Sequence, residues 1–161
     1  LYSRKSFLEI VTNLRRAIPS VGITTDIIVG FPGETEEQFN ETLSLVEEVR
    51  FDGAYMFIYS PRPGTPAADM EPLSLGIRKA RMDRLMELQA AIIAKNHSER
   101  IGQTFEVLVE GPSPRNPDML RGYSREFHMM HFAGSSVLAG QLVLIKATEA
   151  HLWGLKGEIV R

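Results

Sequence analysis

The stretch GITTDIIVGFPGET, residues 22–35, decides the fold of the first part of the chain. Its apolar run 27–29 is typical of a parallel strand that is buried on both faces. Gly30 to Gly33 then predict a sharp turn, and Thr35 starts a helix. Ligands of such α/β sheets bind where the strands end, so this turn is the first place to expect a binding site.

Asp26 is a carboxylate inside this strand. Side chains alternate along a strand, so Thr24, Asp26 and Ile28 share one face, and the apolar residues between them are expected to pack under helices. A buried, unpaired carboxylate is costly, so Asp26 must be paired, solvated or bound to a ligand. A hydrogen bond with Thr24 or with nearby backbone is the structural alternative to a ligand.

Helical spacing of apolar residues predicts three helices, over residues 6–17, 35–50 and 75–97. Ser6 with Glu9 and Thr35 with Gln38 have the spacing of capping boxes. A second strand is expected over residues 54–59, and helices alternating with strands predict βα units around a parallel sheet. Two strands do not make such a sheet alone. We therefore expect further strands before the first residue, in a longer protein.

The pattern changes after Gly102, where apolar and polar residues alternate. Strands are expected over residues 105–109, 127–132, 142–147 and 152–160. Glycines punctuate these segments at intervals typical of a small all-β barrel. The alternate positions among Phe127, Met129, Met130 and Phe132 are expected to supply its core. A boundary near Ser98 gives two domains, 1–97 and 98–161.

The 161 residues include no cysteine and carry a formal net charge of −2. This composition excludes disulfides, thiolate catalysis and cysteine-ligated metal within these residues. With so balanced a charge, any RNA-binding surface has to be a local patch. The sequence also has no apolar run that predicts a membrane span and no secretory leader, so we expect a cytoplasmic location with no membrane partner.

Two motifs, TDIIVGFPGETEEQF at residues 25–39 and FIYSPRPGTPAA at residues 57–68, precede a helix and the segment IGQTFEVLVEG at residues 101–111. With this spacing the chain resembles the radical-SAM methylthiotransferases, and within them the branch that modifies N(6)-dimethylallyladenosine beside the tRNA anticodon. The resemblance implies an α/β plus all-β fold. Residues 1–97 would be the C-terminal portion of an open radical-SAM (β/α) barrel, and residues 98–161 a TRAM domain, a small β-barrel associated with RNA binding.

The resemblance also implies the cofactors and the partner. The full-length protein would use S-adenosylmethionine and two 4Fe-4S clusters to activate an adenosine C–H bond and deliver a methylated sulfur, and the tRNA anticodon stem-loop would be its substrate. The cluster-ligating cysteines of the family would precede this chain. We therefore expect no catalytic residue and no metal ligand in these 161 residues, and no activity from them alone.

By the same resemblance the strand 24–30 would contact the adenine of S-adenosylmethionine. Ile28 and Gly30 match the family's signature in this strand. Asp26 occupies the position at which the signature usually has its first glycine. The expected cofactor-binding residues are Thr24, Asp26, Ile28, Gly30, Phe57, Ser60 and Arg62. Thr65 is expected to line the mouth of the site beside Arg62.

The segment from Arg121 to Arg125 is the best local candidate for RNA contact, because it joins two cations to Tyr123, an aromatic ring that can stack on a base. Arg115, Lys146 and Lys156 extend the expected patch. A solvated turn with ordinary surface charges is the alternative. The family often has an asparagine shortly after this point, where this chain has Glu126-Phe127-His128.

Three other functions remain open. A methylthiotransferase for a ribosomal-protein aspartate tends to have an acidic pair where this chain has 61–63, Pro-Arg-Pro, so this loop favours tRNA. A methylthiotransferase that acts on threonylcarbamoyladenosine in tRNA usually has a different sequence in the strand before the position of Ser60. An RNA-binding module without activity is disfavoured, because an incomplete βα set leaves exposed strand edges. The oligomeric state is left open.

Overall fold

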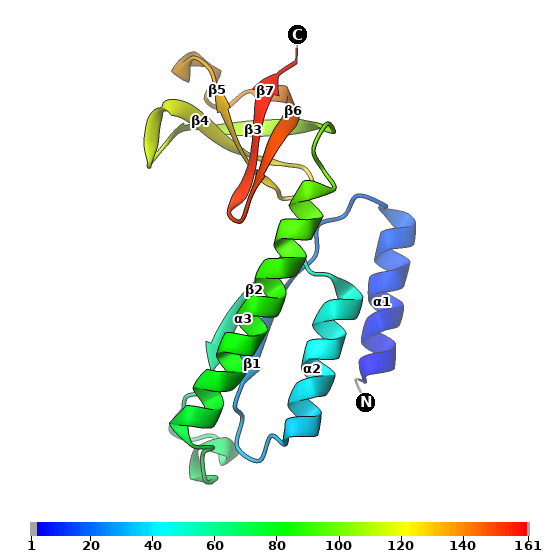
Figure 1. Cartoon of the computed structure of the whole chain (residues 1–161), viewed down its shortest axis with the longest axis vertical. Coiled ribbons are helices and arrows are strands. Elements are labelled where there is room, and N and C mark those ends of the chain that lie inside the picture. The colour runs from blue at the N-terminus through cyan, green and yellow to red at the C-terminus, as the bar shows by residue number, and fades with distance from the viewer. Residues whose placement is uncertain (1–2, 161) are drawn as a thin grey trace. The chain divides into compact units, whose positions relative to one another are not determined.

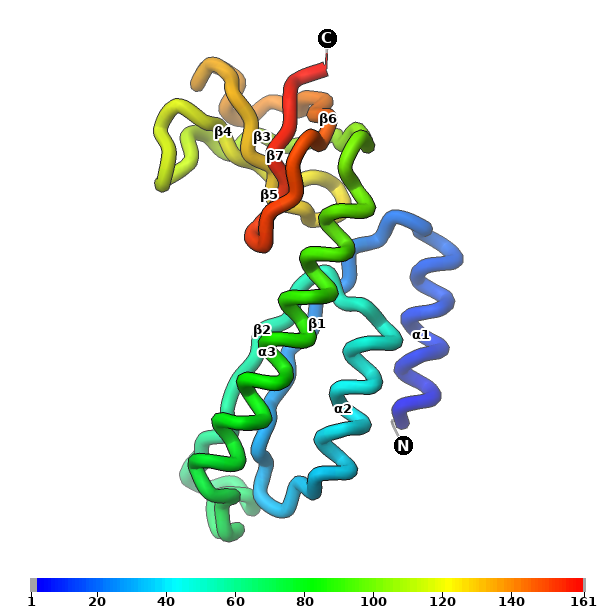
Figure 2. The backbone as a smooth tube through the Cα atoms, viewed as in Figure 1, coloured from blue at the N-terminus to red at the C-terminus, as the bar shows by residue number. Residues whose placement is uncertain are grey.

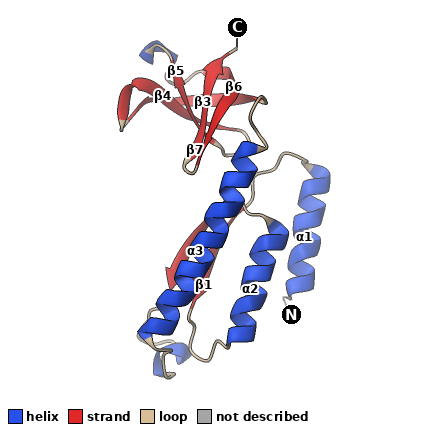
Figure 3. Cartoon of the chain, in the orientation of Figure 1, coloured by secondary structure: helices blue, strands red, loops and turns tan. Residues whose placement is uncertain are grey.

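The structure is a computed structural model that describes residues 3–160; residues 1, 2 and 161, at the outer ends of the two expected domains, lie outside the described residues. The chain divides into two compact units. The first runs to Pro19 and again from Ile23 to Ile93, and the second contains Ser20–Gly22 and the residues from Ala94 onward. Helices dominate the first unit and strands the second (Figure 3).

The first unit alternates helices and strands along the chain. Its elements are α1 (Arg4–Ala17), β1 (Thr24–Val29), α2 (Glu36–Val49), β2 (Gly53–Ile58), the 3-10 turn η1 (Pro66–Asp69) and most of α3 (Leu75–Ser98). β1 and β2 pair in parallel, with Asp26 opposite Tyr55 and Ile28 opposite Phe57. The predicted parallel βα units are therefore confirmed.

The starts of the first two helices test the predicted capping boxes. In α2 the prediction is confirmed, since Thr35 and Gln38 exchange both hydrogen bonds. In α1 the predicted pair of Ser6 with Glu9 is wrong. Ser3 caps the helix: the Ser6 N–H donates to Oγ of Ser3 over 3.2 Å, and the Ser3 N–H donates to Oγ of Ser6 over 2.9 Å. The helix begins at Arg4, two residues before Ser6. Ser6 is therefore its third residue and not its cap.

The core of the first unit lies on one side of its two-stranded sheet. Val29, Phe39 and Leu85 are fully buried where β1, α2 and α3 meet, and all three helices lie on this side (Figure 1). The other side of the sheet exposes the apolar side chains of Ile28, Tyr55 and Phe57, at 57%, 64% and 53%. The strand alternation predicted around Asp26 is confirmed, but the expected burial of both faces is wrong, because the face that carries Asp26 is an open apolar surface.

The predicted apolar stripe of α3 is only partly correct. Leu85 and Ile92 are buried as expected, but Ile77 is exposed. The inward side of the first turns is occupied instead by Arg78 and Arg81, which bond to the loops that follow β2 and β1. A pattern of apolar residues alone does not predict arginines on that side of the helix.

The second unit is a closed barrel with strand order β3-β4-β5-β7-β6. Its strands are β3 (Thr104–Ser113), β4 (Asn116–Ser124), β5 (Met129–Ala133), β6 (Leu142–His151) and β7 (Gly154–Ile159), with the 3-10 turn η2 (Ser136–Leu138) before β6. Figure 2 follows the chain through them. Met130 and Phe132 are buried at alternate positions, as predicted, whereas Phe127 is exposed.

β4 was not predicted, and Gly122 explains its weak signal. The spacing of the glycines predicts a turn at Gly122, but this residue lies within β4 opposite Val109. A Cβ atom on Gly122 would lie 2.1 Å from the carbonyl oxygen of Leu108, so only glycine permits this close approach of two strands. Within residues 3–160, no helix is long and apolar enough to cross a membrane.

Candidate functional site

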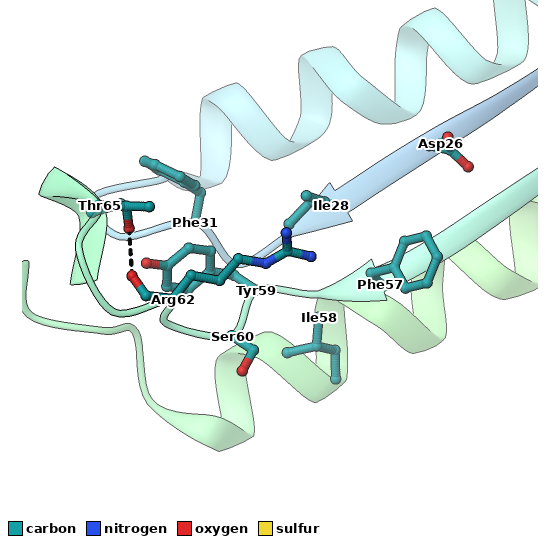
Figure 4. A pocket seen from close by; sticks show the side chains of 10 residues that line it. Asp26, Ile28, Phe31, Phe57, Ile58, Tyr59, Ser60, Arg62 and Thr65 are labelled. Atoms are coloured by element: carbon teal, nitrogen blue, oxygen red, sulfur yellow. Dashed lines mark hydrogen bonds between the residues drawn. The ribbon is translucent and has the colours of Figure 1, made fainter.

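A hollow of about 670 Å³ lies where β1 and β2 end, a size typical of small-molecule sites. It is lined by Asp26, Ile28, Phe31, Phe57, Ile58, Tyr59, Ser60, Arg62, Thr65 and Ala67. Figure 4 shows that Ile28 and Phe57 come from the two strands and Arg62 from the loop after β2. The site therefore lies at the carboxyl ends of β1 and β2, where the sequence predicted it.

Most of the expected cofactor-binding residues meet in this hollow, namely Asp26, Ile28, Phe57, Ser60 and Arg62. Thr24 and Gly30 do not line it. Thr24 is the first residue of β1, at the opposite end of the strand. Gly30 faces α3, where an added Cβ would lie 2.4 Å from Cγ of Arg78.

The side chain of Asp26 projects from the open face of the sheet and is exposed. Within residues 3–160 no hydrogen bond or ion pair engages its carboxylate, so the alternative of a bond with Thr24 is not what the structure has. Solvent satisfies the carboxylate, which leaves it able to accept a donor from a ligand.

A buried ion pair holds the turn after β1. Glu34 Oε2 accepts from Nη1 of Arg81 over 2.7 Å and from the backbone N–H of Gly30 over 2.8 Å. The same Arg81 Nη1 donates to the carbonyl oxygen of Glu34 over 2.9 Å. The two side chains are only 6% and 12% exposed. Gly30 has φ of +73°, a conformation that suits glycine and lets the turn fold back onto Glu34.

The loop after β2 is held by the same helix. Nη1 of Arg78 donates to the carbonyl oxygen of Tyr59 over 3.1 Å, and the Phe31 and Tyr59 rings meet edge to face with centroids 5.1 Å apart. Thr65 Oγ1 donates to the carbonyl oxygen of Arg62 over 2.8 Å (Figure 4). Arg78 and Arg81 thus fix both loops that border the hollow.

Phe31 and Tyr59 line the hollow although neither was among the expected site residues. The Tyr59 hydroxyl is buried and has no hydrogen-bond partner among the described residues. An unpartnered buried hydroxyl in a ligand-sized hollow is a donor available to a ligand. Both aromatics stand next to turn residues in the two sequence motifs, and that position was the signal that could have found them.

The expected RNA-binding cations do not form one bare basic patch. Arg121 on β4 pairs with Glu110 over 3.1 Å, and Lys156 on β7 pairs with Glu149 over 2.6 Å. Arg125, in the turn after β4, pairs with Glu106, and this contact holds its pKa above the usual range. Since each cation already has a carboxylate beside it, its attraction for phosphate is reduced.

Arg115 and Lys146 lie at opposite ends of β3. Arg115 is in the turn between β3 and β4, whereas Lys146 stands opposite Thr104, the first residue of β3. Tyr123 faces outward on β4, between Leu108 and Met129 in register. The alternative of a solvated turn is therefore wrong for Arg121 and Tyr123, which belong to a strand.

His131 joins this outer surface, although it was not expected there. It lies on β5 opposite Arg121 and opposite Lys156. Burial lowers its pKa, and the charges of Arg121 and His151 lower it further, so the ring is neutral at pH 7. No group of three or more His, Asp or Glu side chains within residues 3–160 is placed to hold a metal ion.

The TRAM domain family matches residues 99–160, the stretch that holds all the strands of the barrel. These residues are a TRAM domain. The strands of the TRAM domain carry Arg121, Tyr123 and His131, so the outward side chains described above belong to it.

Nearly the whole chain is similar to proteins named tRNA-2-methylthio-N(6)-dimethylallyladenosine synthase. The protein from Geobacillus kaustophilus is 53% identical over 160 residues, which are 99% of this chain and 30% of that protein. The one from Anoxybacillus flavithermus is 52% identical with the same coverage, and the one from Moorella thermoacetica is 51% identical over 99% of this chain and 36% of its own length. The similarity expected from the two motifs is confirmed. The chain spans about a third of the length of these curated relatives.

Proposed function

We propose that this chain is the C-terminal part of a radical-SAM methylthiotransferase that converts N(6)-dimethylallyladenosine beside the tRNA anticodon to its 2-methylthio derivative. The main support is the identity of about half of all residues, along nearly the whole chain, with synthases named for that product. The similar stretch covers both motifs whose residues line the hollow. In this proposal residues 1–97 belong to the radical-SAM barrel and residues 98–161 to the TRAM domain.

The hollow suits the adenine of S-adenosylmethionine. Ile28 and Phe57 offer apolar side chains to the faces of a purine, and the Tyr59 hydroxyl and Ser60 offer polar groups to its edge. Arg62 brings a cation that can pair with a carboxylate or a phosphate. Asp26 supplies an acceptor for an amino or hydroxyl group of the ligand.

S-adenosylmethionine would supply the radical chemistry, together with 4Fe-4S clusters held outside this chain, which has no cysteine. The residues of this chain bind the cofactor, orient it and exclude water from one side of it. Arg81 and Glu34 keep the turn at Gly30 in place, and Arg78 keeps the carbonyl of Tyr59 in place. None of them forms or breaks a bond in the reaction.

The TRAM domain would bind the tRNA anticodon stem-loop through its outward side chains. Arg121, Tyr123, Arg125 and Lys156 face outward from β4, the turn after it and β7. Arg115 and Lys146 would contact the RNA separately, since they stand at different ends of β3. The cytoplasm, where tRNA is modified, is the proposed location.

The cofactor side of the proposal is tested by Asp26→Ala in the full-length enzyme. Cleavage of S-adenosylmethionine should fall about tenfold or more, which corresponds to the loss of about one hydrogen bond to a charged group. Affinity for tRNA should not change. Glu47→Ala, which removes an exposed carboxylate from α2, is the matched control. Equal loss of cleavage and tRNA binding in Asp26→Ala would remove Asp26 from the cofactor site.

The substrate is tested by offering the reconstituted full-length enzyme two substrates, a tRNA with dimethylallyladenosine and the same tRNA with threonylcarbamoyladenosine. Methylthiolation of the first alone is expected. Modification of the second, or of a ribosomal-protein aspartate, would replace the proposed substrate. The 161-residue chain alone should have no activity after iron–sulfur reconstitution, and activity from it would contradict the assignment of the clusters to residues outside it.

A further inference from the structure

Phe127 has a backbone conformation that is strained for its side chain. It has φ of +65°, in the left-handed region where glycine and asparagine are usual and a bulky aromatic is an outlier. Burial does not compensate this strain, because Phe127 is 63% exposed. Strain of this kind is concentrated at functional sites, where the surrounding structure maintains it.

The turn around Phe127 imposes this conformation from both sides. The Phe127 N–H donates to the carbonyl oxygen of Ser124 over 3.0 Å, and the Ser124 N–H donates to that of His128 over 3.0 Å. The His128 N–H also donates to Oγ of Ser124 over 3.2 Å. His128 itself is buried, so the turn is anchored in the barrel.

The turn lays the Phe127 ring flat against Tyr123. The two ring centroids are 4.7 Å apart and the planes differ by 14°, which is a stacked pair. Tyr123 stands on β4, opposite Leu108 and Met129, so the pair rests on the outer face of the sheet. Tyr123 covers one face of the Phe127 ring, and at 63% exposure most of the remainder is open to solvent.

We propose that the Tyr123–Phe127 pair is a stacking site for one unpaired nucleobase of the bound RNA. This inference rests on the RNA-binding role proposed above. A flat, solvent-facing aromatic ring that is fixed before binding accepts a base of any sequence without an ordering cost. Arg121 and Arg125 flank Tyr123 along the chain and favour a ligand with an anionic backbone.

The pairing of these arginines with Glu110 and Glu106 sets the character of the site. Since each of these cations has a carboxylate beside it, its attraction for phosphate is reduced, and stacking supplies most of the affinity at this point. The site would then select single-stranded nucleotides, whose bases are free to stack, over a fully paired duplex.

The test uses the 161-residue chain and a labelled RNA hairpin that has the anticodon-loop sequence with 2-aminopurine at the modified adenosine or its neighbours. Phe127→Asn removes the ring but keeps a residue that tolerates the left-handed conformation. Affinity should fall about 5- to 100-fold, as for the loss of one stacked base, and quenching of the 2-aminopurine emission should be lost. Phe127→Trp, which keeps a ring, should retain both.

Two further measurements separate stacking from folding and from charge. The melting temperature of Phe127→Asn should equal or exceed that of the wild type, because the strain is relieved. The slope of log affinity against log salt should not change, because no phosphate contact is lost. A lower melting temperature that accompanies the loss of affinity would overturn the proposal.

The outcomes also separate this inference from the function on which it rests. If the wild type binds the hairpin and Phe127→Asn binds it equally, the stacking site is overturned and the RNA-binding role stands. If the wild type binds the hairpin no better than a fully paired duplex of the same length, the stacking site is overturned as well. If the wild type binds neither RNA, the RNA-binding role of the TRAM domain fails with it.

Discussion

The two units of this chain differ in how their sheets bury apolar side chains. In the first unit the sheet is buried on one side only, and the other side exposes Ile28, Tyr55 and Phe57. In the TRAM domain the strands close into a barrel that buries an apolar core, which includes Met130 and Phe132, while Leu108 and Phe127 remain exposed on its outside. The candidate cofactor site is therefore the sheet itself, whereas the candidate RNA site consists of side chains outside a complete core.

This difference indicates how each site is held in shape. The hollow at the ends of β1 and β2 depends on polar contacts from α3, chiefly the pair of Arg81 with Glu34. The outer face of the barrel depends on the apolar core beneath it and on the turn at Phe127. Each site should then respond to a different class of substitution.

The largest expected effect distinguishes two phenylalanines. Phe132→Ala should lower the free energy of unfolding of the TRAM domain by about 4 kcal/mol, because it empties part of a closed core. Phe57→Ala should change the stability of the first unit by less than about 1 kcal/mol, because that ring is more than half exposed. Urea titrations of the chain, followed by NMR signals of each unit, measure both. A large loss from Phe57→Ala would mean that the open sheet face is a core and not a ligand surface.

The next effect concerns the ion pair under the cofactor hollow. Arg81→Ala leaves Glu34 buried without its cation, and should lower the free energy of unfolding of the first unit by about 3 kcal/mol. Arg4→Ala breaks the exposed pair of Arg4 with Glu48 and should cost less than about 1 kcal/mol. Thermal unfolding of the two variants compares them. Similar losses would show that the buried pair does not hold the turn.

The smallest effect is a pH dependence confined to the barrel. The pKa of His131 is lowered in the folded chain from an ordinary value of 6.5, so the unfolded chain binds a proton as the pH falls through that value while the folded chain does not. The stability contributed by neutral His131 is complete above 6.5 and is lost below it. His131→Gln should flatten the decline in melting temperature of the TRAM domain between about pH 7 and pH 5. A profile that is unchanged in this variant would assign the decline to other groups.

The sequence predicted the parts of the fold that repeat a simple pattern. The alternation around Asp26, the helix that begins at Thr35, and the buried positions Met130 and Phe132 all follow from apolar spacing. β4 was missed because Pro117 and Gly122 interrupt the apolar pattern inside a strand. Barrel closure determines where a strand needs glycine, and that contact is made with a residue distant in sequence.

In the candidate sites, too, the sequence predicted the local features and not the contacts between residues distant in sequence. Asp26, Ile28 and Arg62 were found because they belong to two motifs with a known spacing. The contacts of Arg78 and Arg81 with the two loops were not predicted, because they join α3 to residues far away in sequence. Arg81 and Glu34 are more than forty residues apart. The strained ring of Phe127 was also missed, because a positive φ at a phenylalanine has no sequence signal.

The central claim is that the sheet face and the barrel face bind different ligands independently. It is tested most directly by measuring both S-adenosylmethionine cleavage and hairpin affinity in the full-length enzyme, for Asp26→Ala and for Phe127→Asn. Asp26→Ala should lower cleavage about tenfold and leave RNA affinity unchanged, and Phe127→Asn, assayed for cleavage without RNA, should lower only RNA affinity. A variant that loses both activities together, with its melting temperature unchanged, would contradict the account.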